Sequence, residues 1–260
     1  MRNEFVYQVF ALLIAFILVH TLYVTLIRPN AQVHIEAERA MMQADSAHVE
    51  QRSPYVVLRD YEQEACFVLM IWAMFILGYK GLSVSRQQTL LVKDLLGLPA
   101  GMPIGREDLK ELSQRLQSLP AVAQQALLPR AMLTAVERFG ATNSVQDVST
   151  AARNVCESEA ERLESELSII RYIAWAIPSV GFIGTVRGIG DALGQAHRAV
   201  EGDITGVTQS LGVAFNSTFI ALVISIILMF FIHQLQLMQD RLVLDTERYV
   251  DRWFVRRLKI

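Results

Sequence analysis

The sequence has few of the patterns that mark enzymes and nucleic-acid-binding proteins. Its two cysteines, Cys66 and Cys156, are too few for a disulfide framework, and we expect two free thiols. It has no glycine-rich phosphate loop of the Walker type and no Cys/His cluster with the spacing of metal ligands. The net charge of -2 at pH 7 gives no strongly basic surface for nucleic acid. We therefore expect no catalytic residues, no cofactor, no metal ion and no nucleic-acid partner.

Apolar residues, by contrast, make up 52% of the chain and are concentrated in four blocks. A helix that crosses a bilayer needs about 20 mostly apolar residues. The blocks predict transmembrane helices at residues 5–27, 65–82, 168–193 and 207–235. The first block is longer than the apolar part of a typical secretion signal, so we expect it to be retained. The expected fold class is all-α: a polytopic membrane protein with four transmembrane helices in the lipid bilayer.

The distribution of Lys and Arg predicts how the chain crosses the membrane. Basic residues are frequent after the second and fourth spans, whereas residues 28–64 hold four arginines against seven acidic residues. Lys and Arg favour the cytoplasmic side of a membrane. We therefore expect both termini, the insertion 83–167 and the tail 236–260 to be cytoplasmic. Residues 28–64 and the turn 194–206 are expected on the opposite, periplasmic side.

The segments outside the spans are expected to be helical as well. Glycine and proline punctuate residues 97–105, which predicts a loop before the helices of the insertion. Asn143, with Gln146 three residues later, is typical of a helix start. No Gly or Pro occurs from Ser144 to Ile177, so one long helix is expected to run from the insertion into the third span. The fourth span, which contains no proline, is expected to continue as a helix into the tail.

The third and fourth spans differ from the first two in their side chains. The third span brings Gly181, Gly184 and Gly188 to its surface, and small residues allow membrane helices to approach closely. Near its outer end, Arg187 and Asp191 are four residues apart and can form an ion pair. The fourth span holds a run of polar residues within apolar sequence: Asn216, Ser217 and Thr218.

The hydroxyl groups of these two spans have two interpretations. Ser and Thr in membrane helices often donate a hydrogen bond to the carbonyl four residues earlier. Alternatively, Thr185 in the third span and Thr218 in the fourth face one wet cavity. No Asp or Glu lies at the middle of any span, although proton translocation usually needs a titratable group within the membrane. If the chain conducts protons, another chain must supply the acid.

Two motifs resemble those of the MotA/TolQ/ExbB proton channel family. The first is IPSVGFIGTVRGIGDAL in the third span, and the second is LGVAFNSTFIALVIS in the fourth. The matching residues of the first motif are Pro178, Gly181, Gly184, Thr185 and Gly188. In the second motif, Ser217 and Thr218 stand at the position of a Thr pair. The resemblance covers residues 168–235, and four spans with a large insertion between the second and third are similar to the MotA arrangement.

The resemblance implies a ring-shaped homopentamer around two copies of a single-span protein similar to MotB, ExbD or TolR, which carries a membrane Asp. It implies a location in the bacterial inner membrane and a motor, such as a stator, that couples inward proton flow to rotation or other mechanical work. The implied ion path is lined by Thr185 and Thr218, with Ser217 and Asn216 near it. The implied pore-helix packing residues are Pro178, Gly181, Gly184 and Gly188.

The sequence departs from the family at three positions. Val213 stands where ExbB and TolQ carry a Glu, Ala221 replaces a Gly, and Arg187 stands where an apolar residue is common. A second interpretation is a non-conducting sensor or scaffold that relays a periplasmic signal to the helices of residues 83–167. That interpretation gives no reason for the small and hydroxyl-bearing residues. A secondary transporter is disfavoured, because the two pairs of spans show no repeat.

Overall fold

The computed structural model describes residues 2–44, 53–92 and 102–259. The longer helices are α1 (Arg2–Leu22), α2 (Arg28–Ala44), α4 (Tyr61–Val92), α5 (Asp108–Gln117), α7 (Leu127–Thr142), α8 (Val145–Gly194) and α10 (Thr205–Trp253). The short elements are η1 (Tyr23–Ile27), α3 (Pro54–Val57), α6 (Ala121–Gln124), α9 (Ala196–Val200) and η2 (Val255–Arg257). The expected all-α fold class is confirmed for the described residues, in which the one extended pairing is a β-bridge between Ile104 and Leu258.

Four helical segments of the described chain are long and apolar enough to cross a membrane. They are Glu4–Glu38, Tyr61–Val92, Val145–Gly194 and Thr205–Arg257. Many of their large apolar side chains are exposed in the single chain, among them those of Phe10, Phe215 and Ile226. An exposed apolar surface of this extent fits contact with lipid or with other subunits better than contact with water. The prediction of four helices able to span a membrane is confirmed.

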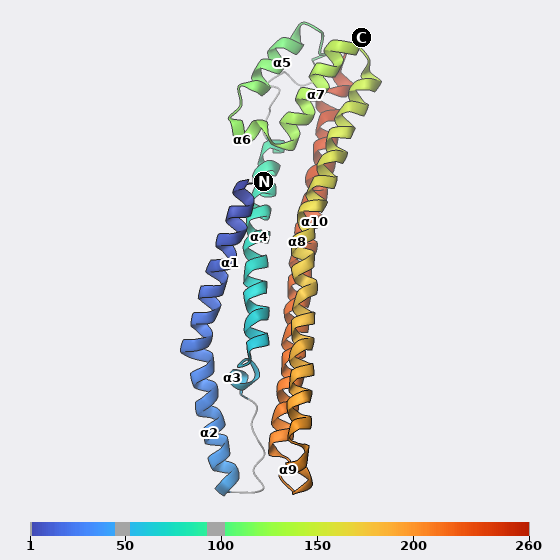
Figure 1. Cartoon of the computed structure of the whole chain (residues 1–260). Coiled ribbons are helices and arrows are strands. Elements are labelled where there is room, and N and C mark those ends of the chain that lie inside the picture. Colours follow the sequence, from blue (N-terminus) through green and yellow to red (C-terminus); the bar gives the residue numbers. More distant parts are fainter. Residues whose placement is uncertain (1, 45–52, 93–101, 260) are drawn as a thin grey trace. The chain divides into compact units, whose positions relative to one another are not determined.

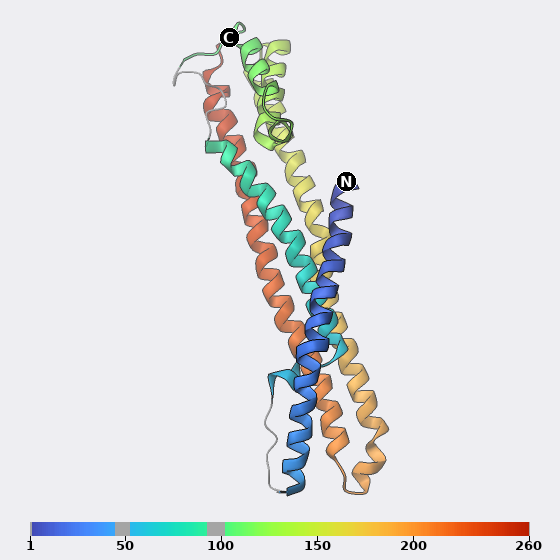
Figure 2. The ribbon, with the colours of Figure 1, turned by 90° about the vertical axis from the view of Figure 1, so that its left-hand side faces the viewer.

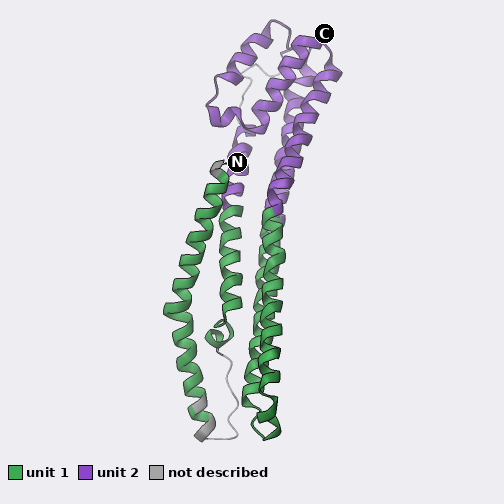
Figure 3. Ribbon diagram, viewed as in Figure 1, with its two compact units in different colours: residues 1–77, 169–232 green, residues 78–168, 233–260 purple. Residues whose placement is uncertain are grey.

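The chain forms two compact units (Figure 3). Unit 1 comprises residues 1–77 and 169–232, and unit 2 comprises residues 78–168 and 233–260. Helices α4, α8 and α10 contribute residues to both units. The continuous helices that the sequence predicts through the third and fourth spans are confirmed, because α8 has 50 residues and α10 has 49. All residues of the predicted ion path belong to unit 1.

In unit 1, α8 and α10 lie side by side and antiparallel (Figures 1 and 2). Gln195 donates a hydrogen bond to the hydroxyl of Ser210 at 3.0 Å near the connection between the two helices. Further along the pair, the hydroxyl of Ser225 donates to the carbonyl of Ala174 at 3.2 Å. The two helices therefore keep one register along their length in this unit.

Glycines of α8 allow the backbones of this pair to approach closely. A Cβ atom built on Gly188 would lie 2.8 Å from the Cβ of Ala214 and equally close to the Ala214 backbone nitrogen. That distance is well inside van der Waals contact. Gly181 faces Ala221 in the same way. Residues without bulky side chains on both helices therefore set the distance between them, as expected for helices packed in lipid.

Helix α1 packs against α4 in the same unit. Tyr23 of the π-helical turn η1 is buried in a cluster with Val68 of α4. Closer to the N-terminus, the indole of Trp72 donates a hydrogen bond to the carbonyl of Gln8 at 2.9 Å. Helix α2 follows η1 directly and reaches Ala44. The first helical segment therefore continues well beyond the end of the predicted first span.

Unit 2 shows how the start of α8 is capped. Asn143 ends α7 with a left-handed backbone, φ 53°, a conformation that Asn tolerates better than most residues. The hydroxyl of Ser144 accepts a hydrogen bond from the backbone N–H of Asp147 at 3.3 Å. Ser144 is therefore the residue that caps α8. The prediction that Asn143 starts this helix is wrong by one residue.

Charged side chains form a network between α4, α7 and α8 in unit 2. Lys80, which is buried, donates to Glu166 at 2.7 Å, and Arg162 donates to the other oxygen of Glu166 at 2.7 Å. Glu159 is buried and accepts from Arg162 at 3.0 Å and from Arg130 at 3.1 Å. Burial alone would raise the pKa of the Glu159 carboxyl, but the hydrogen bonds and charges of Arg162 and Arg130 outweigh burial and lower it.

We expect Gly188→Ala to destabilise unit 1, because the new methyl group would overlap Ala214. Overpacking of this kind costs about 1–3 kcal/mol. Gly190→Ala is the matched control, since a Cβ on Gly190 meets no neighbouring atom of the described residues within 4 Å. Thermal unfolding in detergent should show a lowered midpoint for Gly188→Ala only. Equal midpoints for the two variants would contradict the close packing.

We expect Glu159→Gln to lower the free energy of unfolding by about 2 kcal/mol at neutral pH, since hydrogen bonds to charged groups contribute about 1.5–3 kcal/mol. The contribution is present above the carboxyl pKa of the unfolded chain and is lost as the pH falls through the lowered pKa of folded Glu159. Unfolding measured from neutral to acidic pH should show the difference from wild type shrinking. Glu157→Gln, at an exposed position of the same helix, should differ little from wild type throughout. A pH-independent difference for Glu159→Gln would argue against this account.

Candidate functional site

Thr185 of α8 and Thr218 of α10 lie opposite each other in unit 1, and their hydroxyl groups are hydrogen-bonded to one another. Both side chains are half-buried. The two residues belong to different apolar helices, and the antiparallel register of α8 and α10 brings them to the same level. The structure therefore brings together the two residues that the sequence singled out for an ion path.

Each hydroxyl of the pair also lies near a backbone carbonyl of the opposite helix. The Thr185 hydroxyl is 3.0 Å from the carbonyl oxygen of Ala214 on α10. The Thr218 hydroxyl is 3.1 Å from the carbonyl oxygen of Gly181 on α8. The carbonyl four residues before Thr185, which also belongs to Gly181, is farther away at 3.4 Å. For this pair, bonding between the helices therefore prevails over bonding within one helix.

The number of hydrogen bonds that the two hydroxyls can donate and accept determines which further groups the pair can bind. A hydroxyl donates one hydrogen bond and can accept two. One of the two hydroxyls must therefore donate to the other, which then donates to a carbonyl of the facing helix. The roles of Thr185 and Thr218 can be exchanged by rotating the two O–H bonds, because each hydroxyl has both the other hydroxyl and a carbonyl of the facing helix within reach. The pair also keeps acceptor positions for a further donor, such as water or a protonated carboxyl group.

The other polar residues of the fourth span behave differently. Ser217 is fully buried, and its hydroxyl donates to the carbonyl of Val213 four residues earlier at 2.9 Å. Ser217 therefore follows the intrahelical pattern. Asn216 precedes Thr218 by two residues, and residues with that separation do not face each other on a helix. No hydrogen bond in the described chain joins Asn216 to the hydroxyl pair, so the structure does not bring Asn216 to it.

Gly184, directly before Thr185, is covered from two sides. A Cβ atom built on Gly184 would lie 2.6 Å from the Cβ of Ser217 on α10. It would also lie 3.2 Å from the Cγ of Glu62, in the first turn of α4. The absence of a side chain at Gly184 therefore makes room for both α10 and an acidic side chain of α4. Glu62 was not among the site residues predicted from the sequence.

Glu62 is the principal partner of Arg187. The two oxygens of Glu62 accept hydrogen bonds from Nε and Nη2 of Arg187 at 2.7 and 2.8 Å, a bidentate pair that joins α4 to α8. Asp191, the partner that the sequence predicts, lies farther from Arg187 at 3.9 Å. Because Arg187 follows Thr185 by two residues, this ion pair lies on a different face of α8 from the hydroxyl pair.

A second acidic residue in the first turn of α4 pairs with residues of α1 and α2. Glu64 is buried, and one of its oxygens lies 2.7 Å from Nδ1 of His20. The other oxygen pairs with Arg28. The first turn of α4 is thus tied by carboxylates both to the α1–α2 segment and to α8. The acidic residues of the stretch 60–64, directly before the second span, were the sequence signal for this arrangement. They were used above only to predict on which side of the membrane residues 28–64 lie.

Comparison with known proteins bears on the same helices. Residues 123–248 match the family model of the MotA/TolQ/ExbB proton channel family. The matching region contains all of α7 and α8 and most of α10, and so includes the Thr185–Thr218 pair. No curated protein and no solved structure matches the chain.

We expect Glu62→Gln and Arg187→Gln each to destabilise unit 1, because each removes the bidentate ion pair. For a pair with one partly exposed partner, the coupling between the two changes should be about 1 kcal/mol. A double-mutant cycle, read by thermal unfolding in detergent, measures it: the double variant should lose less than the sum of the single variants. Glu62→Gln combined with Arg198→Gln, an exposed arginine at α9, should be additive. Additivity of the Glu62 and Arg187 changes would show that the bidentate ion pair does not contribute to stability.

Proposed function

We propose that this chain, which belongs over residues 123–248 to the MotA/TolQ/ExbB proton channel family, is a subunit of a complex that couples inward proton flow to mechanical work. The observation that carries the proposal is the hydroxyl pair of Thr185 and Thr218. It places polar groups between two apolar helices, where an unsatisfied hydroxyl would be costly. The pair also keeps acceptor positions for a further hydrogen-bond donor.

A threonine hydroxyl can pass a proton on but does not hold one as a carrier. It has no pKa near neutrality, whereas proton transfer through a membrane usually involves a group that titrates there. No Asp or Glu of this chain lies at the middle of a predicted span. We therefore assign the hydroxyl pair the role of lining the path, and the acidic group to a partner.

The partner in this proposal is a single-span protein similar to MotB, ExbD or TolR that carries a membrane Asp. Two copies of it would lie inside a homopentamer of this chain in the bacterial inner membrane, with both termini of the chain in the cytoplasm. A protonated Asp would donate a hydrogen bond to a free acceptor position of one hydroxyl pair, and deprotonation would remove that donor and let the Asp move to the next pair. Rotation of the ring around the partner would follow from repeating this step.

We expect Thr185→Val and Thr218→Val to reduce partner-dependent proton flux about tenfold or more, the factor that corresponds to one lost hydrogen bond of about 1.4 kcal/mol. Thr218→Ser retains the hydroxyl and should retain most of the flux. The measurement is proton uptake by membrane vesicles that contain this chain together with a single-span protein similar to MotB, ExbD or TolR that carries a membrane Asp.

Ser225→Ala is the matched control for these variants. It also removes a hydroxyl that donates across to α8, at 3.2 Å from the carbonyl of Ala174, but it leaves the Thr185–Thr218 pair intact. Its flux should equal that of wild type. Unchanged flux in both valine variants would show that the assigned path is wrong.

Mass measurement in detergent tests the assembly separately, because a stable monomer or dimer would favour the non-conducting sensor.

A further inference from the structure

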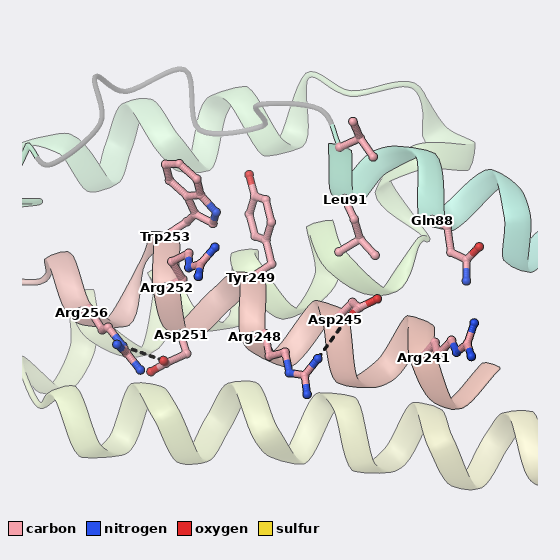
Figure 4. A pocket seen from close by; sticks show the side chains of 11 residues that line it. Gln88, Leu91, Arg241, Asp245, Arg248, Tyr249, Asp251, Arg252, Trp253 and Arg256 are labelled. Carbon is pink, nitrogen blue, oxygen red and sulfur yellow. Dashed lines mark hydrogen bonds and ion pairs between the residues drawn. The ribbon is translucent and has the colours of Figure 1, made fainter. Parts of the chain in front are cut away.

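Unit 2 contains a cleft that the proposed channel does not use (Figure 4). It has a volume of about 680 Å³ and lies between the last turns of α10 and the end of α4. Gln88 and Leu91 of α4 form one side. The other side is formed by charged and aromatic side chains of residues 241–256. Pockets for small molecules have volumes of about 300–1,000 Å³, so the cleft is of suitable size.

Four arginines line the cleft, and two of them form no ion pair with an acidic residue of the described chain. Arg248 lies 3.5 Å from Asp245, and Arg256 lies 2.8 Å from Asp251. These two pairs point to the side of the helix away from the aromatic rings in Figure 4. No ion pair within the described residues involves the other two arginines, which are Arg241 and Arg252. The side chains of Arg241 and Arg252 are exposed, so their two positive charges can attract an anionic ligand to the cleft.

Two aromatic rings form a wall beside one of these free charges. The ring centroids of Tyr249 and Trp253 lie 6.2 Å apart, with the ring planes tilted by 35°. Figure 4 shows the two side chains projecting side by side from the helix, with the guanidinium group of Arg252 next to them. A planar ring stacks well on aromatic side chains and on guanidinium groups. The wall therefore favours a ligand that has a flat ring in addition to its negative charge.

The length of α10 argues against a lipid headgroup as this ligand. Arg252 follows Leu235, the end of the predicted fourth span, by 17 residues, which is about 25 Å along a helix. The headgroup layer extends only about 5–8 Å beyond the hydrocarbon core. Arg241 and Arg252 are themselves about 16 Å apart along the helix, so a ligand that reaches both must be extended. A chain of phosphates attached to a ring is extended, and it contacts both arginines when their long side chains lean toward it.

We propose that this cleft binds a small phosphorylated molecule with a planar ring, of the nucleotide class. The ring stacks on Tyr249 and Trp253, the nearest phosphate is bound by Arg252, and the far end of the phosphate chain reaches Arg241. Such a ligand would join the end of α4 to the tail of α10 within unit 2. Binding is independent of the proposed proton path, whose residues all belong to unit 1.

The test uses the full-length protein in detergent, with ATP as the probe and quenching of tryptophan fluorescence as the signal. We expect saturable quenching that depends on Trp253. Arg252→Gln and Arg241→Gln should each weaken ATP binding about tenfold, the loss expected for one charged hydrogen bond. Arg138→Gln, an exposed arginine of α7 outside the cleft, makes the same change of charge and should bind ATP as wild type does.

Further ligands and variants separate this proposal from its alternatives. Trp253→Phe should retain ATP binding in equilibrium dialysis but lose most of the quenching. Adenosine should not bind, and pyrophosphate should compete more weakly than ATP. Pyrophosphate that competes as well as ATP would overturn the proposal, because the aromatic wall would then add nothing. Binding of an acidic peptide through Arg252 without any binding of ATP would overturn it as well.

Discussion

The hydrogen bonds of the candidate path depend on the short distance between α8 and α10. A threonine side chain is short, so Thr185 can reach the carbonyl of Ala214 only if the two backbones lie close together. Gly188 opposite Ala214 and Gly181 opposite Ala221 permit that approach. A bulkier residue at this interface would separate the helices and leave two hydroxyl groups without acceptors in hydrocarbon. Helix packing and the chemistry of the path therefore depend on the same set of small residues.

Ion pairs join the first turn of α4 to the other helices of unit 1, in addition to the apolar packing of α1 against α4. Glu62 of α4 covers Gly184 and holds Arg187, while Glu64 pairs with Arg28 on the other side. Small-residue packing fixes a short and nearly invariant distance, because atoms in contact resist further approach. Ion pairs between long side chains tolerate larger changes of distance. Unit 1 thus combines a closely packed α8–α10 pair with an attachment of α4 that includes ion pairs between long side chains.

How much could be predicted from the sequence depended on whether a feature is local. The spanning helices were predictable because length and hydropathy are read along one segment. The meeting of Thr185 with Thr218 was accessible because a short turn fixes the register of the two helices. Glu62 and Arg187, by contrast, are 125 residues apart, and their pairing depends on how α4 is rotated against α8. The cap at Ser144 was missed because its neighbour Asn is an equally good cap by type.

The way in which the hydroxyls are bonded explains why a path of this kind can remain closed in a lone subunit. Thr185 and Thr218 are satisfied by each other and by carbonyls of the facing helix, so neither needs water. Their side chains carry no charge, and α8 and α10 offer no carboxylate at this level. A proton can enter only when a stronger donor or acceptor competes for one of these hydrogen bonds. In the proposed complex that competitor is the acid of the partner, so under that proposal conduction would be a property of the assembly and not of a single subunit.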